Sequence, residues 1–183
     1  DFKFTLDGNE QFSSVSEFRV HWEKLKENET LNLFLSEEYL LFVEQPLHRE
    51  FALADFVADE INEWAESPLM IIDESDAELS SLQRALDIGY RGTSHKNCKG
   101  VFKGVANACK INFNKQNIEG EWIISGEDLA NVGPVALLND LVVMASLGIK
   151  HVERNGHHYF AGLSMYPKSL QEKVSLNHSE LYS

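Results

Sequence analysis

The chain alternates short strand-like segments with segments of helical periodicity along its whole length. Six segments are typical of strands, and they lie at 4–6, 40–43, 69–72, 91–98, 122–125 and 151–159. Between them, hydrophobic residues recur at spacings of three and four, which predicts amphipathic helices. Strands that alternate with helices in this way indicate repeated βα units and a parallel sheet.

Each predicted helix is expected to bury one hydrophobic face. The residues of these faces are, in chain order, Val15, Phe18, Trp22 and Leu25; Leu53, Phe56, Val57, Ile61 and Trp64; Leu79, Leu82 and Leu86; Val101, Val105, Ala108 and Ile111; and Leu138, Leu141, Val142 and Ala145. Gly89 is expected to cap its helix in the left-handed conformation, and Gly148 to end another. A last helix is predicted around Leu170 and Val174.

Two architectures contain repeated βα units, the open doubly wound sheet and the closed barrel. A doubly wound sheet usually carries a phosphate-binding glycine loop after its first strand, and neither G-x-G-x-x-G nor G-x-x-x-x-G-K-[ST] occurs here. Polar residues follow several different strands instead, as in barrels. The sequence therefore predicts an α/β fold of the (β/α) TIM-barrel type, with six of the eight units in this chain.

Three of the predicted strands end in acids. Asp7 follows the first, Glu44 ends the second and Asp73 follows the third, and Pro46 cannot continue the second strand's ladder. The carboxyl ends of parallel strands meet at one rim, where buried carboxylates repel each other unless a cation lies among them. Oxygen ligands suit Mg²⁺ or Mn²⁺, so Asp7, Glu44 and Asp73 are predicted metal ligands. The alternative is that these acids only cap neighbouring helices.

Composition excludes several classes of function. The formal net charge of −13 argues against nucleic-acid binding, which needs a basic face. No hydrophobic run approaches the roughly 20 residues of a membrane helix. The two cysteines, Cys98 and Cys109, are separated by a predicted helix, which favours free thiols and a reducing, cytoplasmic compartment.

Four short motifs occur in chain order after successive strands: "DGNE" at 7–10, "EQP" at 44–46, "DES" at 73–75 and "SHKNCKG" at 94–100. Together they resemble the enolase superfamily, in its mandelate racemase and muconate lactonizing enzyme branch. The resemblance implies that Asp7, Glu44 and Asp73 bind Mg²⁺, with Mn²⁺ as a substitute. It further implies that Lys96 is the acid/base lysine and that the neighbouring charge of Lys99 tunes it.

The resemblance also implies a domain organisation. Residues 1–183 would be the C-terminal part of the barrel domain, holding the last six βα units of a modified enolase-type barrel. An N-terminal capping domain and the first strands would precede Asp1, and the full-length protein would be a homo-oligomer. The expected reaction is removal of the α-proton of a small carboxylate substrate to form a metal-stabilised enediolate, as in isomerases and lyases of the muconate lactonizing type.

Two alternatives to this reaction stay open. One is a sugar-acid dehydratase, in which Lys96 is again the base. The other is a barrel that binds the metal and has lost its chemistry.

The last two strands carry further candidates for contacts with substrate. Glu127 and Asp128 lie where the family places residues that flank the substrate, and Glu153 and Arg154 lie at the tip of the last strand. His157 and Lys99 are the other candidates for a contact with substrate. Each could instead form a structural ion pair or a rim contact. His95 precedes Lys96 on an extended segment and should therefore point to the opposite side. The Lys24 and Lys26 pair lies on a predicted helix and is interpreted as part of a solvated face.

Overall fold

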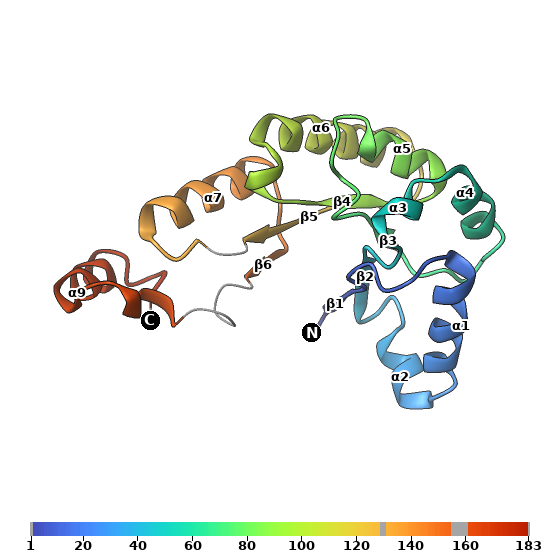
Figure 1. The fold of residues 1–183 in the computed structure, drawn as a ribbon, viewed down its shortest axis with the longest axis horizontal. Coiled ribbons are helices and arrows are strands. Elements are labelled where there is room, and N and C mark those ends of the chain that lie inside the picture. The colour runs from blue at the N-terminus through green and yellow to red at the C-terminus, as the bar shows by residue number, and fades with distance from the viewer. Residues whose placement is uncertain (1, 129–130, 155–160, 183) are drawn as a thin grey trace. The chain divides into compact units, whose positions relative to one another are not determined.

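Parallel strands alternate with helices along the chain, as Figure 1 shows. The computed structural model describes residues 2–128, 131–154 and 161–182. The strands are β1 (Phe4–Asp7), β2 (Leu40–Glu44), β3 (Met70–Ile71), β4 (Gly92–His95), β5 (Ile123–Asp128) and β6 (Val152–Arg154). The α-helices are α1 (Val15–Lys26), α2 (Glu29–Phe34), α3 (Arg49–Ala52), α4 (Asp55–Asn62), α5 (Ser81–Ile88), α6 (Val101–Asn117), α7 (Pro134–Ser146) and α9 (Lys168–Asn177). The described residues also form the 3₁₀ turns η1 (Asn97–Lys99) and η2 (Gly162–Met165).

The strands form two three-stranded sheets, in the orders β1-β2-β3 and β4-β5-β6. The α/β class is confirmed, but in the described residues these sheets do not close into the predicted barrel. A closed barrel has no edge strand, whereas β1 pairs on one side only, with β2. The bridge Ile72↔Thr93 joins β3 to β4, supported by the bond from the Ser94 N–H to the Ile72 carbonyl at 2.8 Å.

The chain divides into two compact units. The first contains residues 1–94 and 106–124, and the second contains residues 95–105 and 125–183. The predicted metal ligands all belong to the first unit, whereas Lys96, Lys99 and the candidates on the last two strands belong to the second.

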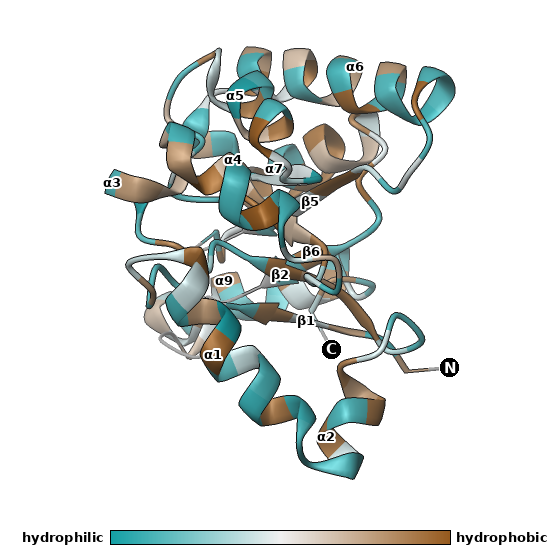
Figure 2. Ribbon diagram, turned by 90° about the vertical axis from the view of Figure 1, so that its right-hand side faces the viewer, coloured by the Kyte–Doolittle hydropathy of each residue, from teal (hydrophilic) through white to brown (hydrophobic). Residues whose placement is uncertain are grey.

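The first unit has one continuous hydrophobic core between its sheet and its helices. The core residues are Val15, Phe18, Trp22, Leu40, Val43, Leu47, Ala52, Val57, Ile61, Trp64, Met70, Ile72, Ala85, Ile88 and Tyr90. In Figure 2 the strand β2 is largely hydrophobic, while α1 alternates hydrophobic and hydrophilic residues along its length. Burying one face of each element in this way removes apolar area from water, and this burial is the main favourable term in folding.

Most predicted helix faces are confirmed in part. Val15, Phe18 and Trp22 of α1 are buried, whereas Leu25, near its end, is exposed. The predicted second helix is two helices, because Leu53 and Ala54 separate α3 from α4. Gly89 caps α5 with a φ of 124°, in the region that favours glycine.

The predicted buried face of α7 is wrong. Leu138 and Val142 are exposed, and the helix instead buries Leu137, Asp140 and Met144. This helix is hydrophobic on nearly all sides, so that periodicity could not identify its buried face. In the described part of the chain, no helix has the length and hydrophobicity needed to cross a membrane.

Candidate metal and acid/base site

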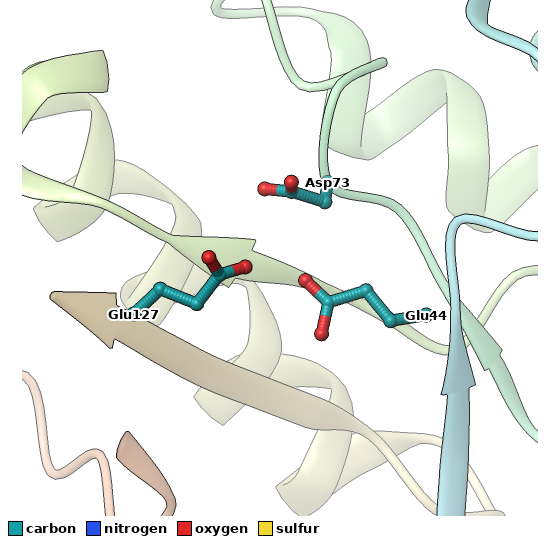
Figure 3. Close-up of side chains that lie close together, drawn as sticks. All are labelled: Glu44, Asp73 and Glu127. Atoms are coloured by element: carbon teal, nitrogen blue, oxygen red, sulfur yellow. The ribbon is translucent and has the colours of Figure 1, made fainter. Parts of the chain in front are cut away.

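Glu44 and Asp73 form a buried carboxylate pair at the carboxyl ends of neighbouring strands. Glu44 is the last residue of β2 and pairs in register with Ile71, so Asp73 follows two residues later on the adjacent strand end. Glu44 is 4% exposed and Asp73 is 3% exposed. A carboxylate oxygen of Glu44 lies within 4.8 Å of one of Asp73. Figure 3 draws both side chains, together with Glu127 of β5, which belongs to the second unit.

Asp7 lies at the same end of the sheet, but its carboxylate has a different environment. Its Cα pairs in register with that of Glu44. The residue is exposed, and the carboxylate accepts hydrogen bonds from the Asn9 N–H at 2.8 Å and the Asn9 side-chain amide at 2.6 Å. The Asp7 carboxylate therefore forms hydrogen bonds within its own loop. Asp7 is exposed, whereas the other two predicted ligands, Glu44 and Asp73, are buried.

The Glu44 and Asp73 pair fits a divalent cation by its chemistry. Two carboxylates buried this close together repel when both are ionised, and a cation between them removes that repulsion. Their four oxygens are hard donors of the kind that Mg²⁺ and Mn²⁺ prefer. Mg²⁺ is often held by one or two carboxylates and fills its other positions with water and substrate oxygens.

Gln45 connects the strand ends around this pair, and sequence analysis assigned it no role. Its side chain is fully buried. Its Oε1 accepts from the N–H of Asp73 at 2.8 Å and from that of Ser75 at 3.2 Å. Its Nε2 donates to the Leu47 carbonyl at 2.7 Å and to the Ser75 hydroxyl at 2.8 Å. A buried side-chain amide must make several hydrogen bonds. The glutamine directly after the strand-end acid was therefore the sequence signal that could have indicated this role.

An ion pair ties the loop after β1 to the helix after β2. Arg49 at the start of α3 donates from Nε to Glu10 Oε1 at 2.7 Å and from Nη2 to Glu10 Oε2 at 2.6 Å. The hydrogen bond to Arg49 lowers the pKa of Glu10 below its ordinary value. The pKa of Arg49 is raised, chiefly by Glu10 and to a smaller extent by the charges of Glu74 and Asp73. Arg49 thus adds positive charge near the carboxylate pair.

Lys96 is paired with Glu127 in the second unit. The distance from Nζ to Oε2 is 3.0 Å, and the two side chains are 14% and 6% exposed. Lys96 directly follows β4 and Glu127 lies on β5. Lysine is rarely buried unless it is paired, and ion pairs exposed to water contribute little to stability. The sheltered pair of Lys96 and Glu127 therefore differs from an ordinary surface ion pair. Two candidates that sequence analysis derived separately therefore form one group.

His95 is the last residue of β4, and its side chain is buried. Its Nε2 lies 2.9 Å from Asn97 Oδ1, and the Asn97 amide donates to Asp140 of α7. Asp140 also accepts from the Asn131 amide. The residues on both sides of Lys96 are thus anchored, and this explains why α7 buries a carboxylate. No motif indicated this network.

The other predicted residues contribute less to the described site. Lys99 is half-buried in η1, and its N–H donates to the Lys96 carbonyl at 2.9 Å. Glu153 of β6 is exposed and pairs in register with Glu127. Asp128 and Arg154 also pair in register, through their backbones. His157 lies outside the described residues.

Both cysteines are exposed free thiols, as predicted from the sequence. Lys24 is exposed, and Lys26 pairs with Glu66 at 3.0 Å, which agrees with a solvated face of α1.

Comparison of the chain with protein-family models, with curated proteins and with solved structures found no match.

Proposed function

We propose that this chain is part of a divalent-metal-dependent enzyme that removes the α-proton of a carboxylate substrate, as in the muconate lactonizing branch of the enolase superfamily. The observation that carries the proposal is the buried Glu44 and Asp73 pair at adjacent strand ends. In (β/α) barrels functional groups gather at the carboxyl ends of the strands, which is where Glu44 and Asp73 lie on β2 and after β3.

The residues divide the work by their chemistry. Glu44 and Asp73 would hold Mg²⁺ or Mn²⁺, which neutralises the charge that develops on the substrate carboxylate. Lys96 exchanges the α-proton. Its partner Glu127 accepts a hydrogen bond from the ammonium form and so holds the amine in one orientation. A lysine acts as a base only when neutral, so substrate binding must release it from this ion pair.

The test is exchange of α-protons with deuterated solvent, followed by proton NMR with a panel of carboxylates in the presence of Mg²⁺. We expect Lys96→Ala to lower the exchange rate by at least about 100-fold, the size typical of losing a general acid or base. Glu44→Gln should also lower the exchange rate, because it removes one of the two carboxylates that would hold the metal. Glu119→Gln and Lys24→Ala are matched controls, because both residues are exposed, and they should exchange at the wild-type rate.

Different outcomes separate the parts of the proposal. Exchange that survives in Lys96→Ala would remove this lysine from the reaction. Exchange that persists after chelation of the metal would contradict the role of Glu44 and Asp73. A protein that binds Mg²⁺ but exchanges no member of the panel would favour the non-catalytic metal-binding barrel.

A further inference from the structure

We infer that Gln45 is a positioning residue that fixes the Asp73 carboxylate relative to that of Glu44. The inference rests on the proposed function, because it assigns Gln45 a role in metal binding. Gln45 does not point its own side chain at the metal in this role. It acts through the backbone that carries the two ligands.

The hydrogen bonds of Gln45 connect three strand ends. Its backbone N–H donates to the Ile71 carbonyl of β3 at 2.9 Å, and its carbonyl accepts from the Glu10 N–H after β1 at 2.9 Å. Its side-chain oxygen accepts from the Asp73 N–H at 2.8 Å. Gln45 follows Glu44 directly, so one residue fixes the backbone at both ligands.

The conformation of Gln45 indicates that this arrangement is specifically maintained. Its φ is 34°, in the left-handed region that few residues other than glycine adopt. Strained backbone persists only where surrounding interactions over-determine it, and such residues cluster at functional sites. Glycine would relieve the strain here but would remove all four side-chain hydrogen bonds.

Glutamine meets the hydrogen-bonding requirements of this position better than glutamate or asparagine. The amide supplies an acceptor for two N–H groups and donors for the Leu47 carbonyl and the Ser75 hydroxyl. A glutamate would lack the donors, and an asparagine is one methylene too short to keep the same reach. Because the side chain is fully buried, water cannot replace the bonds that are lost.

The experiment measures Mn²⁺ binding by isothermal titration calorimetry, with the metal alone as the probe. Gln45→Met removes every side-chain hydrogen bond at nearly constant volume, and Gln45→Asn shortens the reach while tolerating the left-handed conformation. We expect both variants to bind Mn²⁺ about 10- to 100-fold more weakly than the wild type, as for other residues that orient metal ligands. If Gln45→Met fails to fold, Gln45→Asn still decides the result.

The control is Trp64→Phe. It removes a hydrogen bond from a buried residue, the one from Trp64 Nε1 to Glu23 at 3.1 Å. Trp64 precedes β3 in the chain and therefore lies toward the end of the strand opposite Asp73. This variant should lose stability without losing Mn²⁺ affinity. An equal loss of affinity in Trp64→Phe would overturn the positioning role, because the effect would then follow from destabilisation alone.

Amide hydrogen exchange gives a second readout that needs no metal. The Asp73 and Ser75 amides should exchange faster in both Gln45 variants than in the wild type, because they lose their acceptor. Faster exchange with unchanged Mn²⁺ affinity would overturn the inference and leave the proposed function intact. A wild-type protein that does not bind Mn²⁺ would overturn the proposed function, and the role of Gln45 with it.

Discussion

Gly92 lies where β4 passes closest to β5, and replacing it with alanine tests the contact between the strands that lead to Lys96 and Glu127. A Cβ atom at Gly92 would lie 1.7 Å from the Ile123 carbonyl oxygen and 2.7 Å from its carbonyl carbon. To reach the 3.4 Å at which ordinary contacts begin, the methyl group and the oxygen would have to move apart by about 1.7 Å. Because the oxygen belongs to the backbone, no side-chain rotation can provide this space.

The expected cost follows from two terms. Overpacking of this kind costs about 1–3 kcal/mol, and loosening the adjacent bond from the Ile123 N–H to the Arg91 carbonyl adds about 1 kcal/mol. We therefore expect Gly92→Ala to lower the free energy of unfolding by about 3 kcal/mol. With a urea slope of about 2 kcal/mol/M, the unfolding midpoint would fall by about 1.5 M.

The assay is urea unfolding followed by tryptophan fluorescence and by far-ultraviolet circular dichroism. Trp22, Trp64 and Trp122 are all buried in the first unit, so their fluorescence reports on the unit that contains Gly92. Gly133→Ala is the control, because among the described residues beyond its chain neighbours its methyl group would come no closer than 3.7 Å, to the Tyr166 hydroxyl. A Gly92→Ala midpoint within about 0.5 M of the wild type would refute the close approach of β4 to β5.

Two further predictions concern buried and paired ionisable groups. The Tyr90 hydroxyl is fully buried and has no hydrogen-bond partner among the described residues, so Tyr90→Phe should raise stability by about 1 kcal/mol in urea unfolding. Burial also raises the pKa of Tyr90, so wild-type stability should fall as the pH rises above about 10, where the tyrosine of the unfolded chain ionises. This loss of stability should be smaller in Tyr90→Phe. An equal loss in both proteins would contradict the burial of Tyr90. Glu10→Gln should cost at most about 1 kcal/mol at pH 7, because Arg49 is 54% exposed and solvent screens the pair. Since the pairing lowers the pKa of Glu10, the stabilisation from this pair is lost as the pH falls from about 5 through the pKa of Glu10 in the folded protein. Urea midpoints of the wild type and Glu10→Gln that still differ at pH 2 would contradict this.

The elements that sequence alone predicted well are those with a clear hydrophobic face. In α1, Val15, Phe18 and Trp22 lie at helical spacing among polar residues, and this pattern identified their burial. In α7, polar residues are few, and the buried Asp140 lies outside the face predicted from Leu138, Leu141, Val142 and Ala145. Asp140 accepts hydrogen bonds from Asn97, which is distant in sequence, and from Asn131 in the loop before α7, and neither contact leaves a periodic signal.

The candidate site was predictable where the chain itself determined it. Glu44 and Asp73 were predicted at adjacent strand ends because each directly follows a hydrophobic run, and both are buried there. The exposure of Asp7 was not predictable in the same way, because its carboxylate is used within its own turn by Asn9. The pairing of Lys96 with Glu127 depends on how β4 and β5 are paired in space, and local sequence does not encode that register.

Packing and hydrogen bonding explain some residues of the motifs that resemble the enolase superfamily. The residues that they leave unexplained are the ones that bear on function. A Cβ atom at Gly8 would lie 2.5 Å from the Pro46 Cα, so the close approach of the backbone at Pro46 explains the glycine of "DGNE". Gln45 is accounted for by the hydrogen bonds that join the strand ends. Neither explanation extends to the side chains of Glu44 and Asp73, whose buried carboxylates lie close together and repel each other when both are ionised. These two side chains are therefore the part of the motifs that a measurement of Mn²⁺ binding tests directly.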